Sequence, residues 1–269
     1  MFTAVFSPIN LWEWLLGLSG LFTLLWIVHL RVRNASLADV GFCLAFGIIV
    51  LACCISNVGD LSRRMLISGM GLLYAVRLGS HLFSKRVWHK PEDPRYKKIR
   101  TMLGGWESVG MFCYFQLQMP ACLLFAGLLC WVMNHPADAI RWWDGLGVII
   151  FLFAFIGEAL ADRQLESFRQ NSLNNGKTLQ SGLWRYSRHP NYFFESLHWW
   201  AYVPFAIGLP WSGVAIVWPI LMTVSLLWIT GVPWAEMQAL ASRGDSYREY
   251  QQTTNMFFPW FPQKVGEKA

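Results

Sequence analysis

The sequence predicts an all-α polytopic membrane protein built as a bundle of seven transmembrane helices. Hydrophobic residues make up 55% of the 269 residues and charged residues only 14%, whereas soluble domains carry about 25% charged residues. The chain also holds several apolar runs of about 20 residues, each long enough to cross a hydrocarbon core of roughly 30 Å. Because the loops between these runs are too short to fold independently, we expect residues 1–269 to form a single membrane-embedded domain.

The apolar segments and the basic residues between them predict an orientation. Most of the 22 Lys and Arg residues lie after the first segment, between the third and fourth, between the fifth and sixth, and after the seventh. All four stretches would face one side, so the positive-inside rule puts the N-terminus outside and the C-terminus in the cytoplasm. We expect an integral protein of a membrane such as the bacterial inner membrane. The predicted spans are 11–30, 37–55, 65–84, 108–133, 143–162, 191–208 and 213–233.

The N-terminus, the cysteines and the net charge suggest no further function. No cleavable signal peptide is expected, because no basic region precedes the first apolar run and no small-residue cleavage site follows it. The six cysteines show no metal-ligand spacing, so we expect no metal site. We interpret the adjacent Cys53 and Cys54 as helix filler rather than a redox pair. We attribute the net charge of +6 to basic residues that set the orientation in the membrane, rather than to nucleic-acid binding.

Polar side chains within the apolar segments gather at the predicted cytoplasmic end. They are Asp39, Arg77, His81, Glu158, Asp162, Asn191, Glu195 and Glu236, with Tyr74 near the middle of the third segment. An isolated Arg at a helix end more often anchors the helix in the interface. Acidic side chains are too short to reach the interface easily, so several that converge favour a functional cavity over inert anchoring.

The spacing of these residues places them on helix faces. Glu158, Asp162 and Arg169 are four and seven residues apart and share one face if the fifth helix continues past the membrane. Pro190 suits the first turn of a helix. From there Asn191, Glu195, His198 and Tyr202 also share one face. Two polar faces joined by a basic loop predict a cavity that opens to the cytoplasm.

The residue types around this cavity favour an anionic, hydrogen-bonding ligand such as a nucleotide phosphate. Arg side chains bind phosphate well, and the helix that starts at Pro190 adds free N–H groups and a favourable dipole. The sequence has neither a GxGxxG nor a GxxxxGK[ST] motif, so a Rossmann or P-loop site is not supported. A polar cofactor at the mouth and a lipid-like substrate in the bundle would indicate chemistry on a hydrophobic molecule.

Four stretches of the chain resemble one family of membrane enzymes. "GLWRYSRHPNYFFE" (182–195) resembles the C-terminal signature of the steroid 5α-reductase-like membrane enzymes, above all of their bacterial branch. "EDPRY" (92–96), "EALADRQLESF" (158–168) and "SYREYQQTTNMFFPW" (246–260) are similar to that branch in order and spacing. The resemblance implies a seven-helix bundle that binds NADPH from the cytoplasmic side and reduces a C=C bond conjugated to a ketone or thioester.

The resemblance also implies roles for individual residues. Asp162 and Arg169 match the Asp and Arg that hold the cofactor, Glu158 occupies the position of a family Asn, and Asn191 and Glu195 match the "N…E" of the signature. The full cofactor-binding set that we expect is Arg77, Glu158, Asp162, Arg169, Tyr186, Arg188, His189, Asn191, Glu195 and Tyr250. The "RHP" triplet looks more like the related sterol reductases and isoprenylcysteine methyltransferases.

For the substrate, the resemblance implies a carboxylate–tyrosine pair from early helices that grips the ketone. Tyr74 sits where the family Tyr does, and Asp39 is the candidate acid, although the family has a Glu. A Tyr hydroxyl backed by a carboxylate would stabilise the enolate that forms when hydride reaches the β carbon. "GVPWAEMQAL" replaces the family's Arg and His after the last span, so Glu236 is expected to make a different contact.

Two other functions fit parts of the sequence. A methyltransferase of the isoprenylcysteine type, which uses S-adenosylmethionine, shares an "RHPxY" stretch and a glutamate after its last helix, but has adjacent glutamates where this chain has Ala235 and Glu236. A non-enzymatic lipid-binding or transport protein would explain a polar cavity but not its arginines. Membrane lipids and a hydrophobic, steroid-like or other enone substrate are the expected partners.

Overall fold

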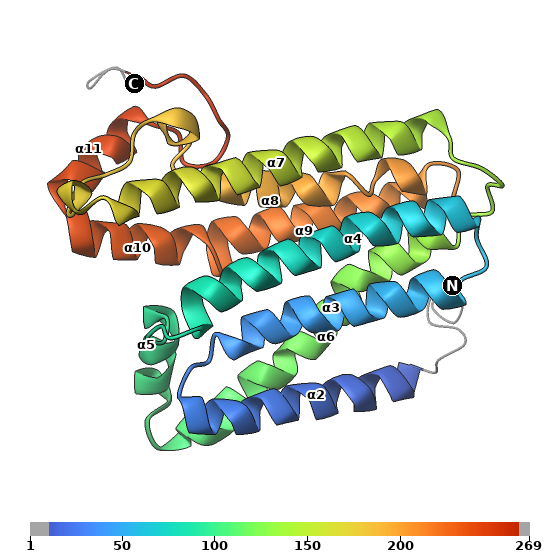
Figure 1. The fold of residues 1–269 in the computed structure, drawn as a ribbon, viewed down its shortest axis with the longest axis horizontal. Coiled ribbons are helices and arrows are strands. Elements are labelled where there is room, and N and C mark those ends of the chain that lie inside the picture. Colours follow the sequence, from blue (N-terminus) through green and yellow to red (C-terminus); the bar gives the residue numbers. More distant parts are fainter. Residues whose placement is uncertain (1–10, 264–269) are drawn as a thin grey trace. The chain divides into compact units, whose positions relative to one another are not determined.

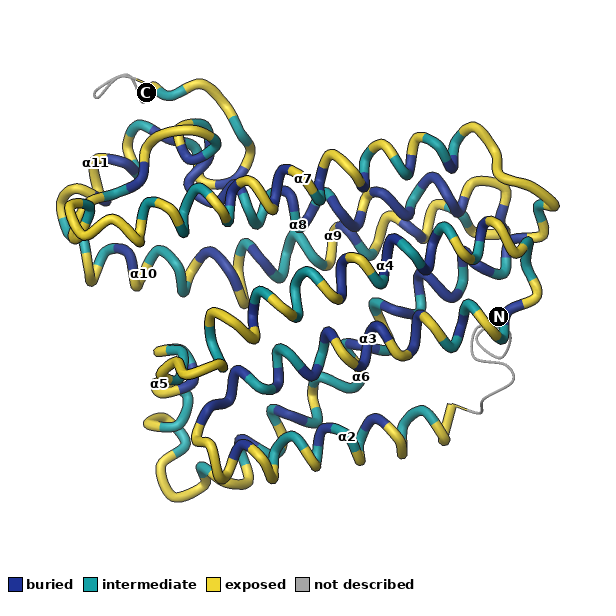
Figure 2. Tube along the Cα trace, in the orientation of Figure 1, coloured by how far each residue is buried: buried dark blue, intermediate teal, exposed yellow. Residues whose placement is uncertain are grey.

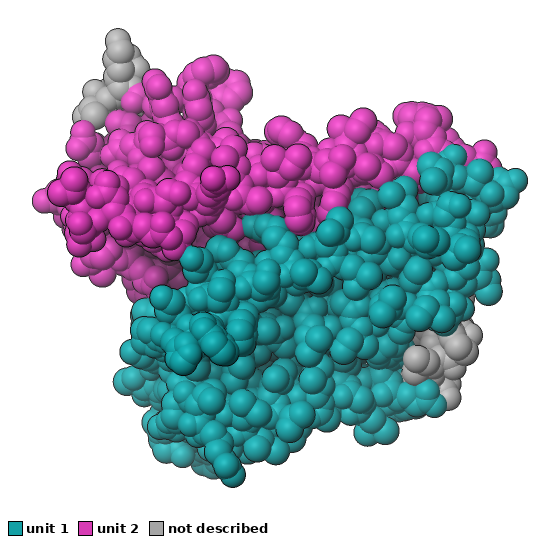
Figure 3. Space-filling view, in the orientation of Figure 1, with its two compact units in different colours: residues 1–140 teal, residues 141–269 magenta. Residues whose placement is uncertain are grey.

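The computed structural model describes residues 11–263, and every regular element in that range is a helix. No strand occurs among these residues, which confirms the all-α prediction. The chain folds into two compact units, residues 1–140 and residues 141–269 (Figure 3).

Unit 1 consists of long helices around a central one (Figure 1). Its helices are α2 (Leu11–Val32), α3 (Leu37–Ser56), α4 (Leu61–Leu82), α5 (Pro94–Leu103) and α6 (Glu107–Met133). The central helix α3 packs against α2, α4 and α6, and Figure 2 shows that it is buried along much of its length. Its small residues permit this contact on several sides, because Gly, Ala and Cys let neighbouring helices approach closely.

Close contacts fix how α3 and α4 face each other. A Cβ on Gly79 would lie 3.1 Å from Cβ of Cys43, and a Cβ on Gly47 would lie 3.6 Å from Cβ of Ala75. The two helices are therefore antiparallel, with Cys43 level with Gly79 and Gly47 level with Ala75.

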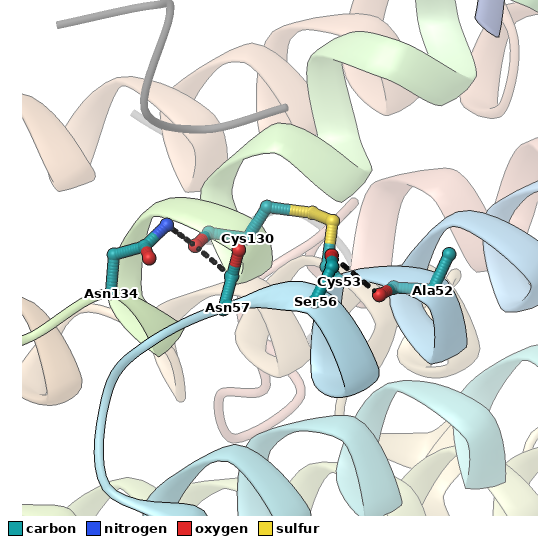
Figure 4. Close-up of a disulfide and its surroundings, with 6 residues drawn as sticks. All are labelled: Ala52, Cys53, Ser56, Asn57, Cys130 and Asn134. Carbon is teal, nitrogen blue, oxygen red and sulfur yellow. Dashed lines mark hydrogen bonds between the residues drawn. A yellow bond between two sulfur atoms is a disulfide. The ribbon is translucent and has the colours of Figure 1, made fainter. Parts of the chain in front are cut away.

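A disulfide joins the C-terminal ends of α3 and α6 (Figure 4). It links Cys53 to Cys130, 77 positions apart. Beside it, Asn57 and Asn134 both donate side-chain N–H groups to the carbonyl of Cys130, at 2.9 and 3.1 Å. The interpretation of Cys53 as helix filler is therefore wrong, whereas Cys54 keeps a free thiol.

Unit 2 is organised along its longest helix, α7 (Trp142–Gln170). The other helices are α8 (Pro190–Trp200), α9 (Val217–Val224), α10 (Val232–Arg243) and α11 (Asp245–Thr253). Because α7 continues past residue 162, Glu158, Asp162 and Arg169 do lie on one helix, as their spacing requires.

Within the described residues 11–263, six helical segments are long and apolar enough to cross a membrane. They are Leu11–Val32, Leu37–Ser56, Leu61–Val87, Pro94–Met133, Trp142–Gln170 and Ser212–Arg243. Many large apolar side chains on them point outward, among them Leu16 on α2 and Ile149 and Phe153 on α7, as suits lipid-facing surfaces. The length and composition of these helices indicate an integral membrane protein.

The segment predicted as the sixth span, 191–208, is not one continuous helix. Helix α8 ends at Trp200, and turns and a short 3-10 helix (Pro204–Ala206) follow. The pyrrolidine ring of a proline clashes with the carbonyl four residues earlier, so Pro204 accounts for an end at Trp200. The segment still packs alongside α7, since a Cβ on Gly147 would lie 2.5 Å from the ring of Phe205. Seven crossings therefore remain a prediction.

Candidate functional site

The two polar helix faces predicted from the sequence meet at the interface between α7 and α8. Asn191 Nδ2 donates to Asp162 Oδ1 at 3.3 Å. One turn deeper, a Cβ on Gly157 would lie 2.4 Å from the ring of Phe194. Only a glycine lets the Phe194 ring come this close to α7. The two helices are thus antiparallel and in close contact at the level of these polar residues.

The local sequence explains why Asn191 stands where it does. His189 precedes the helix with a non-helical backbone, and Pro190 occupies the first helical position, where a missing N–H costs no helical hydrogen bond. Asn191 therefore lies in the first turn. Its Oδ1 is buried and has no hydrogen-bond partner in the described part of the chain, which is uncommon for a buried acceptor. Glu158, on the facing helix, is only 4% exposed.

A second cluster is centred on the carboxylate of Glu236, in α10. Arg188 approaches Oε1 through Nε and Nη2, both at 2.7 Å, and His189 Nε2 lies 3.3 Å from the same oxygen. Gln251 Nε2 donates to Oε2 at 2.9 Å, and the Tyr247 hydroxyl lies 3.5 Å from Oε1. This cluster, which we call the Glu236 hub, joins the start of α8 to α10 and α11.

Contacts within the protein occupy most of the N–H groups of the Arg188 side chain. Besides Glu236, its Nη1 donates to the carbonyls of Gln251 and Thr254 at 3.2 and 2.8 Å, and its backbone N–H donates to Asn255 at 2.8 Å. With a buried guanidinium and few N–H groups left, Arg188 holds the C-terminal segment in place.

The C-terminal segment is fastened to the loop before α8 by further hydrogen bonds. The Tyr250 hydroxyl donates to the carbonyls of Trp184 and Ser187. The backbone N–H of Trp260 donates to Tyr186 at 2.9 Å, and the Tyr186 ring packs edge-on against Phe261. Tyr250 is therefore a buried structural residue, and Tyr186 lies at the edge of this contact.

Burial sets the ionisation of the hub residues that lie outside the apolar spans. Burial lowers the pKa of His189, and the positive charge of Arg188 adds to this, although the hydrogen bond and charge of Glu236 act in the opposite direction. The imidazole is therefore neutral near pH 7. Burial, together with the charge of Glu236, raises the pKa of Tyr247 to about 12, so its hydroxyl keeps its proton.

Arginines without carboxylate partners stand at the same end of unit 2. Arg169, near the end of α7, and Arg243, at the end of α10, are close enough to repel each other electrostatically. Arg243 stacks over the Tyr247 ring at 4.8 Å, and Arg169 is exposed. Within residues 11–263 neither forms an ion pair. Two guanidinium groups that repel each other favour the binding of an anion near them.

In unit 1 the candidate acid Asp39 has partners that the sequence did not reveal. The Tyr96 hydroxyl donates to Asp39 Oδ1 at 2.6 Å, and the Tyr114 hydroxyl lies 3.5 Å from the same oxygen. Arg86 and Arg95 reach Oδ2 at 3.3 and 3.5 Å. Tyr96 and Arg95 belong to the stretch "EDPRY", whose family resemblance does not reveal these contacts with Asp39.

The neighbouring Asp93 secures α5 to this cluster. It caps the helix by accepting from the Arg95 backbone N–H at 3.0 Å and pairs with the Arg95 guanidinium at 3.1 Å. Burial would raise the pKa of this carboxyl, but the hydrogen bonds and charge of Arg95 outweigh that effect, and the pKa is lowered.

Tyr74 and Asp39 do not form the expected pair. Tyr74 is buried, and its ring packs edge-on against Phe46. Since Ala75 is level with Gly47, Tyr74 lies about nine residues along α3 from Asp39, which is roughly 13 Å at about 1.5 Å per residue. Arg77 lies on the same helix, partly buried, one turn nearer the level of Asp39.

Comparison with known proteins places the chain in a family. The model of the family described as "Protein of unknown function (DUF1295)" matches residues 25–254. The chain is similar to "Uncharacterized protein C594.04c" of Schizosaccharomyces pombe, with 26% identity over 228 residues. That match covers 74% of this chain and 64% of the relative, so this chain spans less than two thirds of the relative's length. No solved structure matches the chain. Because the family model extends over most of the sequence, the protein belongs to the DUF1295 family.

Proposed function

We propose that this protein is a membrane oxidoreductase that binds NADPH at the arginine-bearing end of unit 2 and reduces the C=C bond of a hydrophobic conjugated enone. The observation that carries the proposal is that Arg169 of α7 and Arg243 of α10 repel each other electrostatically, while neither forms an ion pair within residues 11–263. Helix α7 also bears Asp162, which accepts a hydrogen bond from Asn191 of α8. The DUF1295 family is associated with steroid 5α-reductase-like membrane proteins, which supports the same reaction class.

The side chains at this end fit an anionic, hydrogen-bonding cofactor. Arg169 and Arg243 would hold phosphate groups through charge-assisted hydrogen bonds. The N-terminus of α8 adds a favourable dipole, and Asn191 offers an unpaired acceptor, Oδ1. Arg188, His189 and Tyr250 are left out of these contacts, because they are engaged within the protein.

In this proposal the cofactor supplies the hydride, and the protein supplies orientation, an excess of positive charge and exclusion of water. The end of the protein that carries these arginines would face the cytoplasm, as the positive-inside rule predicts. The hydrophobic substrate would enter from the lipid, in which the apolar spans stand.

Arg169→Ala and Arg243→Ala are each expected to weaken NADPH binding roughly 10- to 100-fold. That range corresponds to the loss of about 1.5–3 kcal/mol for a hydrogen bond to a charged group. The measurement is a titration of the purified protein with NADPH, followed by cofactor fluorescence. Arg248→Ala is the matched control, because Arg248 is an exposed arginine of the same unit that pairs with Asp245, and it should bind as the wild type does.

The same titration decides between the proposed function and its rivals. The Glu236 hub joins "RHP" to a glutamate, two features shared with methyltransferases of the isoprenylcysteine type, so S-adenosylmethionine is titrated in parallel. Saturable binding of S-adenosylmethionine alone would replace the reductase by a methyltransferase. Binding of neither compound would leave a lipid-binding or transport protein.

Tyr74 remains our candidate for the group that polarises the substrate carbonyl. We expect Tyr74→Phe to lower turnover about 10²-fold or more, in line with the loss of one preorganised donor, while NADPH binding stays unchanged. NADPH consumption over a panel of enones measures this effect. A near-normal rate in Tyr74→Phe would remove Tyr74 from the mechanism.

A further inference from the structure

Helix α5 lies across one end of the long helices of unit 1 rather than alongside them (Figure 1). In its first turn, the Tyr96 hydroxyl donates to Asp39 at the start of α3. Four residues further, about 6 Å along the helix, Arg100 lies 3.2 Å from His29 in the last turn of α2 and pairs with Glu107 at the start of α6. Because α2 and α3 are long and apolar enough to cross a membrane, α5 lies at a membrane surface.

The charges on the inward face of α5 are balanced within unit 1. Arg100 donates to both carboxylate oxygens of Glu92, at 2.9 and 2.8 Å. Asp93 pairs with Arg86 at 3.7 Å and with Arg95 at 3.1 Å. These arginines are therefore occupied by carboxylates of the same unit, and they do not supply charge to an external ligand.

The opposite side of α5 carries lysines. Lys97 and Lys98 are exposed on the helix, and Lys90 is exposed in the loop before it. The carbonyl of Lys90 accepts from Asn34 Nδ2 at 3.4 Å, which places this loop at the same end of unit 1. Within residues 11–263 neither Lys90 nor Lys97 forms an ion pair. The positive charge at this end of unit 1 is therefore directed outward.

Large apolar side chains are exposed beside these lysines. Met102, in the last turn of α5, is 76% exposed, and Trp106, in the short 3-10 turn that follows, is 74% exposed. Trp is favoured at the boundary between headgroups and acyl chains. A surface helix with lysines and apolar side chains is typical of helices that lie in this boundary.

The combination of charge and apolar surface selects the ligand. A soluble phosphate or a nucleic acid would match the lysines but leave Met102 and Trp106 in water. An anionic phospholipid matches both, because its phosphate attracts Lys and its acyl chains accept apolar side chains. This end of unit 1 is also the end that the positive-inside rule places at the cytoplasmic leaflet, which carries anionic lipids.

We propose that Lys90, Lys97, Lys98, Met102 and Trp106, which we call the α5 surface, bind anionic phospholipids. The lysines hold the headgroup phosphates, and Met102 and Trp106 enter the boundary of the acyl chains. Neither the arginines on the inward face of α5 nor the proposed NADPH site is part of this surface. The inference therefore stands or falls independently of the reductase function.

The first test measures the preference for anionic lipid. Purified protein in detergent is titrated with phosphatidylglycerol and with phosphatidylcholine of the same acyl chains, and bound lipid is counted by native mass spectrometry. The wild type should bind phosphatidylglycerol more tightly. Lys90→Gln/Lys97→Gln should weaken that binding roughly 5- to 30-fold, the effect of one to two lysine charges at an anionic surface, and leave phosphatidylcholine binding unchanged.

A matched variant separates this surface from the overall charge of the protein. Arg163→Gln/Lys177→Gln removes two exposed positive charges from unit 2 and should bind phosphatidylglycerol as the wild type does. Inorganic phosphate should not displace the lipid when ionic strength is held constant with sodium chloride. Equal binding of the two lipids by the wild type, an equal loss in both double variants, or displacement by phosphate would each overturn the proposal.

The second test needs no loss of charge and works in intact membranes. The photoreactive residue p-benzoylphenylalanine replaces Met102 or, as the control, Glu249, which is exposed on the polar helix α11. After irradiation, mass spectrometry of the purified protein should find phospholipid adducts at position 102 in much higher yield than at position 249. Adducts with protein or nucleic acid at position 102, or equal lipid yields at both positions, would contradict a lipid-binding α5 surface.

Discussion

Glu236→Ala is expected to lower the free energy of unfolding by about 3–5 kcal/mol, the range for removing one partner of a buried ion pair. The change would leave the guanidinium of Arg188 buried, 8% exposed at its side chain, with no carboxylate to balance it. It would also remove the acceptor of Gln251 and Tyr247. The measurement is the thermal unfolding midpoint of the purified protein in detergent, which should fall markedly.

The comparison with an exposed ion pair makes this test specific. Asp245→Asn breaks the pair between Asp245 and Arg248, whose side chains are 93% and 67% exposed, and surface pairs contribute only about 0–1 kcal/mol. The double variant Arg188→Met/Glu236→Met should be more stable than Glu236→Ala, because no buried charge is then left alone. If Glu236→Ala and Asp245→Asn shift the midpoint equally, the hub is not a stabilising centre.

The helical periodicity of the sequence predicted the contact between α7 and α8. Residues four apart on each helix were assigned to one face, and the structure brings Asp162 and Asn191 from those faces into a hydrogen bond. This succeeded because a membrane helix has one dominant period, and polar residues on it must find a partner inside the protein. The start of α8 was also predictable, since Pro190 marks it.

Contacts between residues far apart in the sequence were not predictable in the same way. Arg188 and His189 were expected to bind the cofactor, but Glu236, 48 and 47 positions away, engages both. No local pattern reveals such a pairing. For Asp39, the Tyr96 hydroxyl comes from a segment that sequence spacing alone does not place. The end of α8 could be predicted from the sequence, because Pro204 stands four residues after Trp200 and its ring clashes with the carbonyl of that residue.

The disulfide is a further contact of this kind, and it bears on the orientation of the protein. Disulfides form and persist in oxidising compartments and are rare in the cytosol. Cys53 and Cys130 stand at the C-terminal ends of α3 and α6, the ends that the positive-inside rule places outside. Asp39, in the first turn of α3, stands at the opposite end. Charge distribution and thiol chemistry thus favour the same orientation by independent arguments.

Cys53→Ser is therefore expected to increase the number of reactive thiols although it removes a cysteine. The wild type has four free cysteines, and the variant should add Cys130 to them. Thiols are trapped in intact cells with a membrane-permeant maleimide and counted by mass spectrometry under denaturing, non-reducing conditions. Cys54→Ser, the neighbouring free cysteine, is the control and should lose one label. All six cysteines labelled in the wild type would show that these helix ends face a reducing compartment, and would contradict the proposed orientation.

The same variant is expected to be less stable. Closing a loop across 77 positions removes conformational entropy from the unfolded chain, worth about 4 kcal/mol in the chain-entropy treatment. Because helices that stay inserted in the membrane keep the unfolded chain ordered, we expect Cys53→Ser to lose only part of that value. Thermal unfolding of unreduced Cys53→Ser, wild type and reduced wild type measures this. The midpoint of reduced wild type should match that of the variant, because both lack the cross-link and keep the other contacts of α3 and α6. A much lower midpoint for the variant alone would assign the loss of stability to the serine rather than to the missing disulfide.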